Sequence, residues 1–365
     1  MKRLQRPSRR GFTLIEILVA TAISLVLVLG VVQIAVYALK AYDNAMSLVS
    51  TTAVSRQVLD TLERDLQSAI LRNDSGVWLE CAADQTPPPS DNANFDKGAC
   101  KSLLFFSTPT DRDLFKPGKS GAGRESYKGE VCAMRYRLDC RNPLPTSLRT
   151  DENKDRAYTL SRTIIDPEKT FADILTKTSE GTAKSLHEIW NSYNYNNGVS
   201  SRPLKDNSPA DIFGMNVVGL TPVFIFKKTD TSKTPASSWF FYAYPKSTVN
   251  DTFYKDPKNF AEGFGSDASA TAFSPLPFDT IQLAAGKYAI DQPGVASKDK
   301  TWKDGTLAAV LVSITVVDDI GADKIRALQN PDLGGTSKLK DEDWEKIVLE
   351  HGRSYVRRIN LPGAE

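Results

Sequence analysis

Charge is almost absent from one stretch of this 365-residue chain. Between Phe12 and Leu39, Glu16 is the only charged residue and Gln33 the only amide. At about 1.5 Å per residue, a helix of this length exceeds the roughly 30 Å hydrocarbon core of a bilayer. We therefore predict that residues 12–39 form a helix long enough to span a membrane.

A cleavage site of the ordinary secretory kind is also missing. A signal peptide has a short apolar core followed by a small-residue site such as A-x-A. Here nothing after Leu39 resembles that site, and the apolar run is too long for a signal core. The small residue is Gly11, which lies before the run and after five basic residues. The pattern speaks against an ordinary signal peptide. A simple membrane anchor remains open, although it does not explain the position of Glu16.

Histidine is scarce, and this scarcity removes the usual starting points for catalysis. The two histidines, His187 and His351, stand in separate polar contexts, with no arrangement nearby that suggests a metal site or a catalytic triad. We therefore predict no catalytic residues, no metal site and no cofactor, and we expect the protein not to be an enzyme.

Two further strings fall short of binding motifs. Residues 116–120 (KPGKS) resemble the end of a phosphate-binding loop, but Asp113 occupies the position of its required first glycine. Residues 151–155 resemble the start of a calcium loop. There Arg156 and Arg162 replace the turn glycine and the bidentate glutamate. Both strings are better interpreted as solvated loops.

An excess of positive charge is absent from the part of the chain that follows Gly11. The formal net charge of the whole chain is +2, but residues 1–11 contribute five basic residues and no acidic ones. The remainder has 41 basic and 44 acidic residues, so its net charge is near −3. This balance gives no support for nucleic-acid binding, which requires a basic face.

The four cysteines all follow the apolar run. An even number of cysteines in an exported segment indicates disulfides, and four cysteines allow three connectivities. The pairs nearest in sequence are Cys81 with Cys100 and Cys132 with Cys140. A zinc site is the alternative, but no C-x2-C spacing is present.

Glu16 is unusual because a carboxylate inside an apolar span is costly and normally has a partner. If the chain is cut after Gly11, Phe12 acquires a free α-amino group one helical turn away from Glu16. In a bundle of identical helices, Glu16 faces the amine of a neighbour instead. Either pairing offsets the cost of desolvating the carboxylate.

Residues Gly11-Phe12-Thr13-Leu14-Ile15-Glu16, after their basic leader, resemble the prepilin class III signal of type IV pilins and type II secretion pseudopilins. The resemblance implies that a prepilin peptidase cuts between Gly11 and Phe12 and methylates the new N-terminus. It also implies that Glu16 is the assembly glutamate. Many major pilins have a proline midway along this helix, but here none occurs between Phe12 and Leu71. That absence favours a minor subunit.

The helix is predicted to continue past Lys40 as an amphipathic half over residues 40–73, ending near Asn73–Gly76. Its apolar stripe includes Leu48, Ser55, Leu59, Leu62, Leu66 and Ile70, with Arg56, Glu63, Arg64, Asp65 and Arg72 between them. We expect the stripe of residues 45–71 to pack on the chain's own head, residues 74–365.

The head is predicted to be antiparallel β with long loop insertions, which makes the fold class α+β. Loops are expected at 82–99 and 108–129, and long insertions at 166–210 and 245–306. Pro222 is expected to mark a bulge or an edge, and at least half of the aromatic side chains in 239–244 to face a core. The expected strands are 102–107, 131–138, 158–165, 213–227, 237–244, 280–283, 307–317 and 355–361. Short helices are expected at 171–176, 183–193 and 341–351.

Parts of the head extend the resemblance. Residues 55–69 (SRQVLDTLERDLQSA) resemble the helix end of larger minor pilins and minor pseudopilins of the PilW and pseudopilin J type. Residues 134–138 and 158–162 resemble their paired strands, and 213–226, 307–317 and 355–361 follow in the expected order. These head motifs are degenerate and cover about a third of the head.

The resemblance implies a subunit that is built into, or primes, a type IV pilus or a type II secretion pseudopilus. Its expected location is the bacterial inner membrane, with the N-terminus cytoplasmic and the head periplasmic, and afterwards the filament. Expected partners are the prepilin peptidase, other pilin or pseudopilin subunits, the inner-membrane assembly platform and membrane lipid. The alternatives are a membrane-anchored adhesin or ligand-binding protein that never polymerises, and an anchored enzyme.

Overall fold

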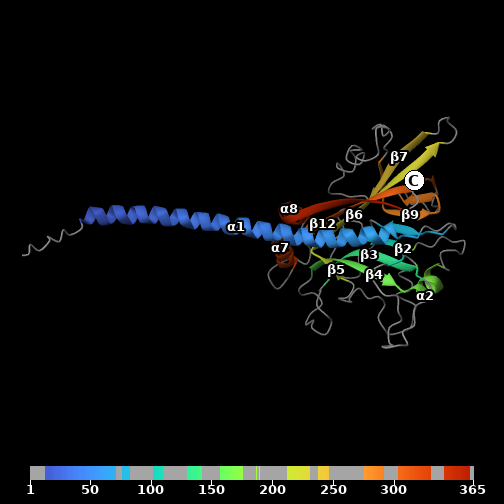
Figure 1. Cartoon of the computed structure of the whole chain (residues 1–365), viewed down its shortest axis with the longest axis horizontal. Coiled ribbons are helices and arrows are strands. Elements are labelled where there is room, and N and C mark those ends of the chain that lie inside the picture. The colour runs from blue at the N-terminus through green and yellow to red at the C-terminus, as the bar shows by residue number, and fades with distance from the viewer. Residues whose placement is uncertain are drawn as a thin grey trace, which may run out of the picture. The chain divides into compact units, whose positions relative to one another are not determined.

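The computed structural model describes residues 13–70, 76–82, 102–109, 130–141, 157–175, 186, 189, 212–230, 237–245, 275–291, 303–329 and 341–361. Their contacts divide the chain into two compact units, residues 1–50 and residues 51–365. The fold class is α+β, as predicted, because one long helix precedes antiparallel sheets (Figure 1).

The first unit contains the apolar part of helix α1, which runs from Leu14 to Gln67. In this unit the side chains of α1 are almost all exposed, including the leucines, isoleucines and valines from Leu14 to Val49. The helix is long and apolar enough to cross a membrane. A helix whose apolar side chains are exposed on every side is suited to contact with lipid or with neighbouring helices.

In the second unit, the last part of α1 buries one side. The buried residues include Leu59, Leu62 and Leu66 of the predicted stripe, together with Val58. Leu48, the first residue of the predicted stripe, is exposed, so the buried side begins later than predicted. The helix ends at Gln67, earlier than the predicted boundary at 73. Extended pairing replaces it, because Ala69 bridges Ser107 and the amide of Ile70 donates to the carbonyl of Phe106 over 2.9 Å.

The larger sheet has eight strands in the order β11-β10-β9-β1-β2-β3-β4-β5, all paired antiparallel. Its central strands, which carry Leu103, Phe105 and Tyr136, contribute to the same core cluster as Leu62 and Leu66 of α1. The bounds are β1 Leu79–Ala82, β2 Ser102–Ser107, β3 Cys132–Arg141, β4 Ala157–Ile165, β5 Ile212–Met215, β9 Thr280–Ala284, β10 Lys287–Asp291 and β11 Lys303–Asp304.

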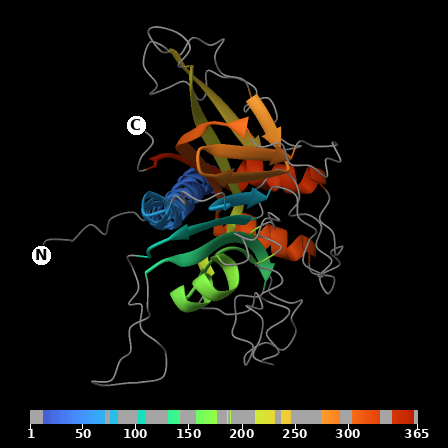
Figure 2. The same ribbon diagram turned by 90° about the vertical axis from the view of Figure 1, so that its right-hand side faces the viewer.

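The smaller sheet has five strands in the order β13-β12-β6-β7-β8, with a parallel pair between β7 and β8. Residues 51–67 of α1 lie between β13 of this sheet and β3 and β4 of the larger sheet (Figure 2). The bounds are β6 Val217–Asp230, β7 Ser237–Pro245, β8 Pro275–Phe278, β12 Thr306–Val317 and β13 Gly352–Asn360.

Asn216 separates the two sheets, because β5 belongs to the larger sheet and β6 to the smaller one. Its φ of 59° is in the left-handed region, which asparagine tolerates better than most residues. Its backbone amide donates to the carbonyl of Tyr158, and its own carbonyl accepts from the backbone amide of Val317. Its side-chain amide donates to the carboxylate of Asp319 over 3.1 Å. Sequence analysis predicted one strand over 213–227. The turn at Asn216 instead divides it into β5 and β6.

Helices α7 (Asp319–Gln329) and α8 (Asp341–His351) cover a second apolar cluster. In it, Ile325 of α7 and Ile347 of α8 are buried with Tyr158 and Val317. Before β5, the short helix α2 (Pro167–Lys169) leads into a π-helical turn, Thr170–Leu175. The predictions of helices near 171–176 and at 341–351 are confirmed, whereas α7 was not predicted.

Most predicted strands correspond to observed ones, and the strand predicted at 280–283 is β9. The interval 245–306, interpreted as an insertion that is mostly loop, also holds three strands that were not predicted. It contains β8, β9, β10 and β11, which pair in both sheets. The prediction at Pro222 is confirmed in part. No register shift occurs there, yet the pairing with β7 starts only at Phe224, so Pro222 has a partner strand only in β12. Three aromatics of β7, Phe241, Tyr242 and Tyr244, are buried, which confirms their core role.

The strand geometry excludes the predicted disulfide between Cys132 and Cys140. Both residues lie on β3, eight positions apart in one extended strand. At about 3.3 Å per residue, their Cα atoms are about 26 Å apart, whereas a disulfide needs less than about 7 Å. The two residues were paired because they are neighbours in sequence. An extended strand makes such neighbours distant.

The register of β1, β2 and β3 also prevents Cys81 from reaching either of these residues. Cys81 and Cys132 pair with Leu103 and Ser107, which are four positions apart on β2. Leu103 in turn pairs with Tyr136 of β3, so Cys81 is aligned across the sheet with Tyr136, which is four positions from Cys140. Four positions correspond to about 13 Å. Any disulfide within this chain would therefore have to include Cys100, which lies outside the described residues. The Cys81–Cys100 pair stays a prediction.

Candidate functional site

The first helical turn of α1 is closed by reciprocal hydrogen bonds between Thr13 and Glu16. The backbone amide and the hydroxyl of Thr13 donate to the Glu16 carboxylate over 2.9 and 3.1 Å. In return, the amide of Glu16 donates to the Thr13 hydroxyl over 3.3 Å. This arrangement is a capping box, which satisfies amides that a helix start leaves without intrahelical partners. Glu16 therefore has a role in shaping the helix start besides any role in assembly.

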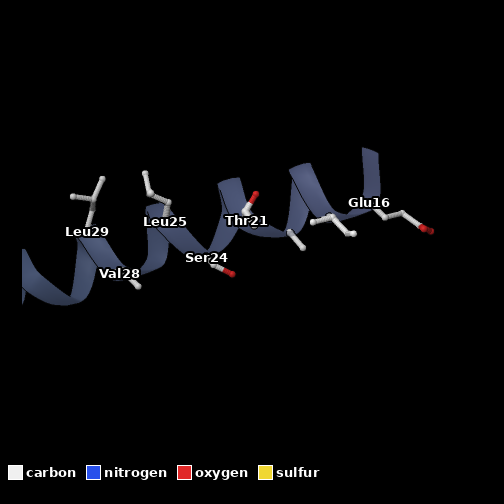
Figure 3. A pocket seen from close by; sticks show the side chains of 8 residues that line it. Glu16, Thr21, Ser24, Leu25, Val28 and Leu29 are labelled. Carbon is white, nitrogen blue, oxygen red and sulfur yellow. The ribbon is translucent and has the colours of Figure 1, made fainter. Parts of the chain in front are cut away.

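The capping box also fixes where the negative charge lies. A carboxylate in the first turn interacts favourably with the positive end of the helix dipole. In Figure 3 the side chain of Glu16 points away from the following turns of the helix. The carboxylate is exposed, so a cation on another molecule can reach it without breaking a buried contact. Gly11 and Phe12, the predicted processing residues, lie outside the described residues.

One strip of α1 continues from Glu16 and contains the polar side chains of this region. We call it the Glu16 strip; it consists of Glu16, Ile17, Ala20, Thr21, Ser24, Leu25, Val28 and Leu29 (Figure 3). Thr21 donates to the carbonyl of Leu18 over 2.9 Å, which satisfies its hydroxyl within the helix. The small residues Ala20 and Ser24 allow another helix to approach closely. The strip therefore offers a helix-packing face that begins at an exposed carboxylate.

The second unit contains a buried charged cluster that attaches α1 to the larger sheet. Arg162 of β4 donates from Nε and Nη2 to the two carboxylate oxygens of Asp65 over 2.8 and 2.7 Å. Tyr136 of β3 donates its hydroxyl to Asp65 Oδ2 over 2.5 Å. Asp65, Arg162 and Tyr136 are at most 3% exposed. We call these three residues the Asp65 cluster.

The Asp65 cluster changes the properties of Tyr136. Burial raises the pKa of Tyr136 well above its ordinary value, and the negative charge of Asp65 raises it further, while Arg162 opposes this effect. The tyrosine therefore stays protonated and donates to the carboxylate. A bidentate arginine–carboxylate pair is geometrically specific, because both hydrogen bonds require one orientation. The cluster thus fixes α1 at one position on the sheet.

Two further contacts hold the same stretch of α1. The carbonyl of Asp65 accepts from Ser107 of β2 over 2.8 Å, next to the end of the helix. On the side of the smaller sheet, Arg357 of β13 donates to Asp60 and Glu63. These carboxylates raise the pKa of Arg357, Asp60 most, against the opposing effect of partial burial. Residues 51–67 therefore have polar contacts to both sheets in addition to their apolar core.

Sequence analysis assigned Asp65 to the polar side of the helix and gave Tyr136 and Arg162 no role. That assignment of Asp65 was wrong, because its side chain faces the core. One signal was available in the sequence. Asp65 lies between Leu62 and Leu66, so it stands on the flank of the stripe that they define. The identity of its partners depends on strand register, which the sequence did not give. The capping box had a clearer signal, T-x-x-E at residues 13–16.

The remaining candidates of the sequence analysis stay outside both sites. His351 lies at the end of α8, where its Nδ1 is 3.2 Å from a carboxylate oxygen of Asp318. His187 and the strings at 116–120 and 151–155 lie outside the described residues. Within the described ranges, no three histidine, cysteine, aspartate or glutamate side chains gather closely enough to hold a metal ion.

Comparison with known proteins supports the interpretation of the N-terminus. Residues 6–32 match the family model described as the prokaryotic N-terminal methylation motif. The match includes Gly11, Phe12 and Glu16 and extends past Leu29, the last residue of the Glu16 strip. The chain thus carries a prepilin-type signal of the kind found in type IV pilins and pseudopilins. No curated protein and no solved structure matches the chain.

Proposed function

We propose that the chain is a minor pilin-like or pseudopilin subunit. A prepilin peptidase cuts it after Gly11 and methylates Phe12, and the mature subunit is built into, or primes, a type IV pilus or a type II secretion pseudopilus. The observation that carries the proposal is the methylation motif at residues 6–32, in register with the apolar helix and with Glu16. The absence of a proline between Phe12 and Leu71 and the large β head favour a minor subunit of the PilW or pseudopilin J type.

In this proposal the protein is not an enzyme. The basic leader keeps the N-terminus in the cytoplasm, α1 waits in the inner membrane, and the head lies in the periplasm. The inner-membrane platform then moves the subunit into a helical assembly of other pilin subunits. Head-to-tail contacts of this kind extend into filaments when they do not close into a ring. The exposed carboxylate of Glu16 provides the contact for a neighbour's methylated amine.

The test of processing is the intact mass of the protein purified from its native host. The expected species begins at methylated Phe12, and Gly11→Ala should leave the leader attached. If the only species is the unprocessed chain beginning at Met1, the proposal fails. The alternative, an anchored adhesin that does not polymerise, then becomes the better explanation.

The role of Glu16 is separated from its capping role by two substitutions. Glu16→Gln keeps an oxygen that accepts from Thr13 but removes the charge, because glutamine also serves in a capping box. Thr13→Ala keeps the charge and removes the capping hydroxyl. We expect the Glu16→Gln protein to be processed and inserted but absent from sheared filaments, and the Thr13→Ala protein to assemble. Assembly of Glu16→Gln at the wild-type level would contradict charge pairing.

A further inference from the structure

Gln33 is a polar residue within the apolar part of α1 that no contact described above uses. It lies seven residues before Lys40, the first charged residue after the span, and 17 residues after Glu16. These separations are about 10 and 25 Å along the helix, so Gln33 lies inside the hydrocarbon layer if α1 spans a bilayer. Its side chain is exposed and bonds to no other described residue of α1. In lipid, such an amide requires a partner from another helix.

The position of Gln33 defines a side of the helix that differs from the Glu16 strip. At 100° per residue, Gln33 lies about 180° from Ser24, which is nine residues earlier. A seven-residue repeat through Gln33 places Val19 and Val26 at equivalent a positions. The intervening d positions are Ile15, Ala22, Leu29 and Val36. We call these seven residues the Gln33 seam.

The Gln33 seam has the features of a parallel two-helix contact. β-Branched residues at a positions favour two strands when leucine is at d, as Leu29 is here, and a single polar a residue fixes the register. The apolar seam residues include Val19, Val26 and Val36, which are 53%, 68% and 43% exposed. An amide both donates and accepts, so two Gln33 side chains at the same depth can bond to each other. Two copies of one chain insert in the same orientation, which brings these side chains to the same depth.

We propose that the Gln33 seam is a homodimer contact in the membrane, through which two copies of this chain associate before they enter a filament. The proposal rests on the membrane insertion that the proposed function requires, but not on processing at Gly11. The Glu16 strip, apart from Leu29, faces elsewhere and stays available for a subunit of the growing filament. A dimer of this kind would store subunits in the membrane with their amides satisfied.

The test uses the full-length chain in phosphatidylcholine vesicles under reducing conditions, labelled at the C-terminus with a donor or an acceptor dye. Energy transfer is measured as the protein-to-lipid ratio increases. Gln33→Leu should weaken dimerisation about three- to thirtyfold, the range expected for one interhelical polar contact. Gln33→Asn, which keeps the amide, should retain most of the association. Neither substitution disturbs the fold of the head, because Gln33 belongs to the first unit.

A photo-crosslinker then identifies the face. At Val26, within about 20° of Gln33 around the helix, it should join two copies; at Val31, about 160° away, it should not. The proposal is overturned if the wild-type chain shows no transfer between copies, if Gln33→Leu associates as tightly as wild type, or if Val31 crosslinks as well as Val26. Because these measurements use the unprocessed chain, their failure is distinct from a failure of cleavage at Gly11.

Discussion

Replacement of Asp65 by asparagine tests whether the Asp65 cluster holds α1 on the head. Asparagine has nearly the same volume, but it has no charge and only one accepting oxygen. Arg162 would then face an amide where it now donates two charge-assisted hydrogen bonds, and Tyr136 would lose its charged acceptor. Removing one partner of a buried ion pair costs about 3–5 kcal/mol, because the other charge stays buried. We expect Asp65→Asn to lower the free energy of unfolding by this amount.

The matched control is Asp60→Asn, five residues earlier on α1. Asp60 also bonds to an arginine, Arg357, but its side chain is 55% exposed. An exposed ion pair contributes about 1 kcal/mol or less, because water and salt screen it. The two substitutions therefore change the same functional group on the same helix and differ in burial. A ratio of at least about three between their effects is expected.

The assay is urea unfolding of the full chain in mild detergent, followed by the fluorescence of its five tryptophans. The slope of the free energy against urea must agree between variants, so that a change of midpoint reports stability alone. If Asp65→Asn costs no more than Asp60→Asn, the Asp65 cluster does not contribute as argued, and the apolar stripe alone holds the helix.

The remaining predictions concern the head. Because burial and the charge of Asp65 raise the pKa of Tyr136, this residue stays protonated in the folded state where an unfolded tyrosine ionises. Its contribution to stability is complete below about pH 10 and falls above it, by up to about 1.4 kcal/mol per pH unit. Tyr136→Phe should remove that part of the alkaline loss, which urea unfolding between pH 9 and pH 11 measures. Asn216→Ala should cost about 1–2 kcal/mol and Asn216→Gly less, since φ is 59° there and glycine adopts it freely; equal costs would contradict this reason. Gly321→Ala places a methyl group against the Cβ of His351 and should lower stability by about 1–3 kcal/mol, whereas a thermal midpoint equal to wild type would show that α7 and α8 separate easily.

Local pattern was sufficient to predict the long helix, the α+β class and most strands. Composition alone identifies the apolar run, and the valines, isoleucines and threonines of β12 are typical of a strand. The pattern failed where an element is short or depends on distant partners. The four residues of β1 are stabilised by pairing with β2 and β9. Of these two strands, β9 lies far from β1 in sequence. Strands β8, β10 and β11 have the same dependence within a region rich in loop-forming residues.

Glu16 and Asp65 show the same limit of prediction from local sequence pattern at the candidate sites. Glu16 was found from the sequence because it stands alone in an apolar run, where any charge needs an explanation. Asp65 was missed because it stands among charges on an amphipathic helix, where a carboxylate is ordinary. Its burial follows from the pairing of β3 with β4, which places Tyr136 directly opposite Arg162. That register is a property of the folded sheet, so no local pattern around Asp65 contains it.

A double substitution, Asp65→Asn with Arg162→Met, separates stability from register. Replacing both members of a buried pair is often nearly neutral, so we expect most of the loss from Asp65→Asn to be recovered. The apolar stripe that remains, Leu59, Leu62 and Leu66, repeats the same side chain about every turn and discriminates poorly between positions that differ by one turn. We therefore expect the double variant to fold with near wild-type stability but with weaker hydrogen-exchange protection of residues 51–67. Protection equal to wild type in that variant would mean that the leucines alone specify where the helix lies.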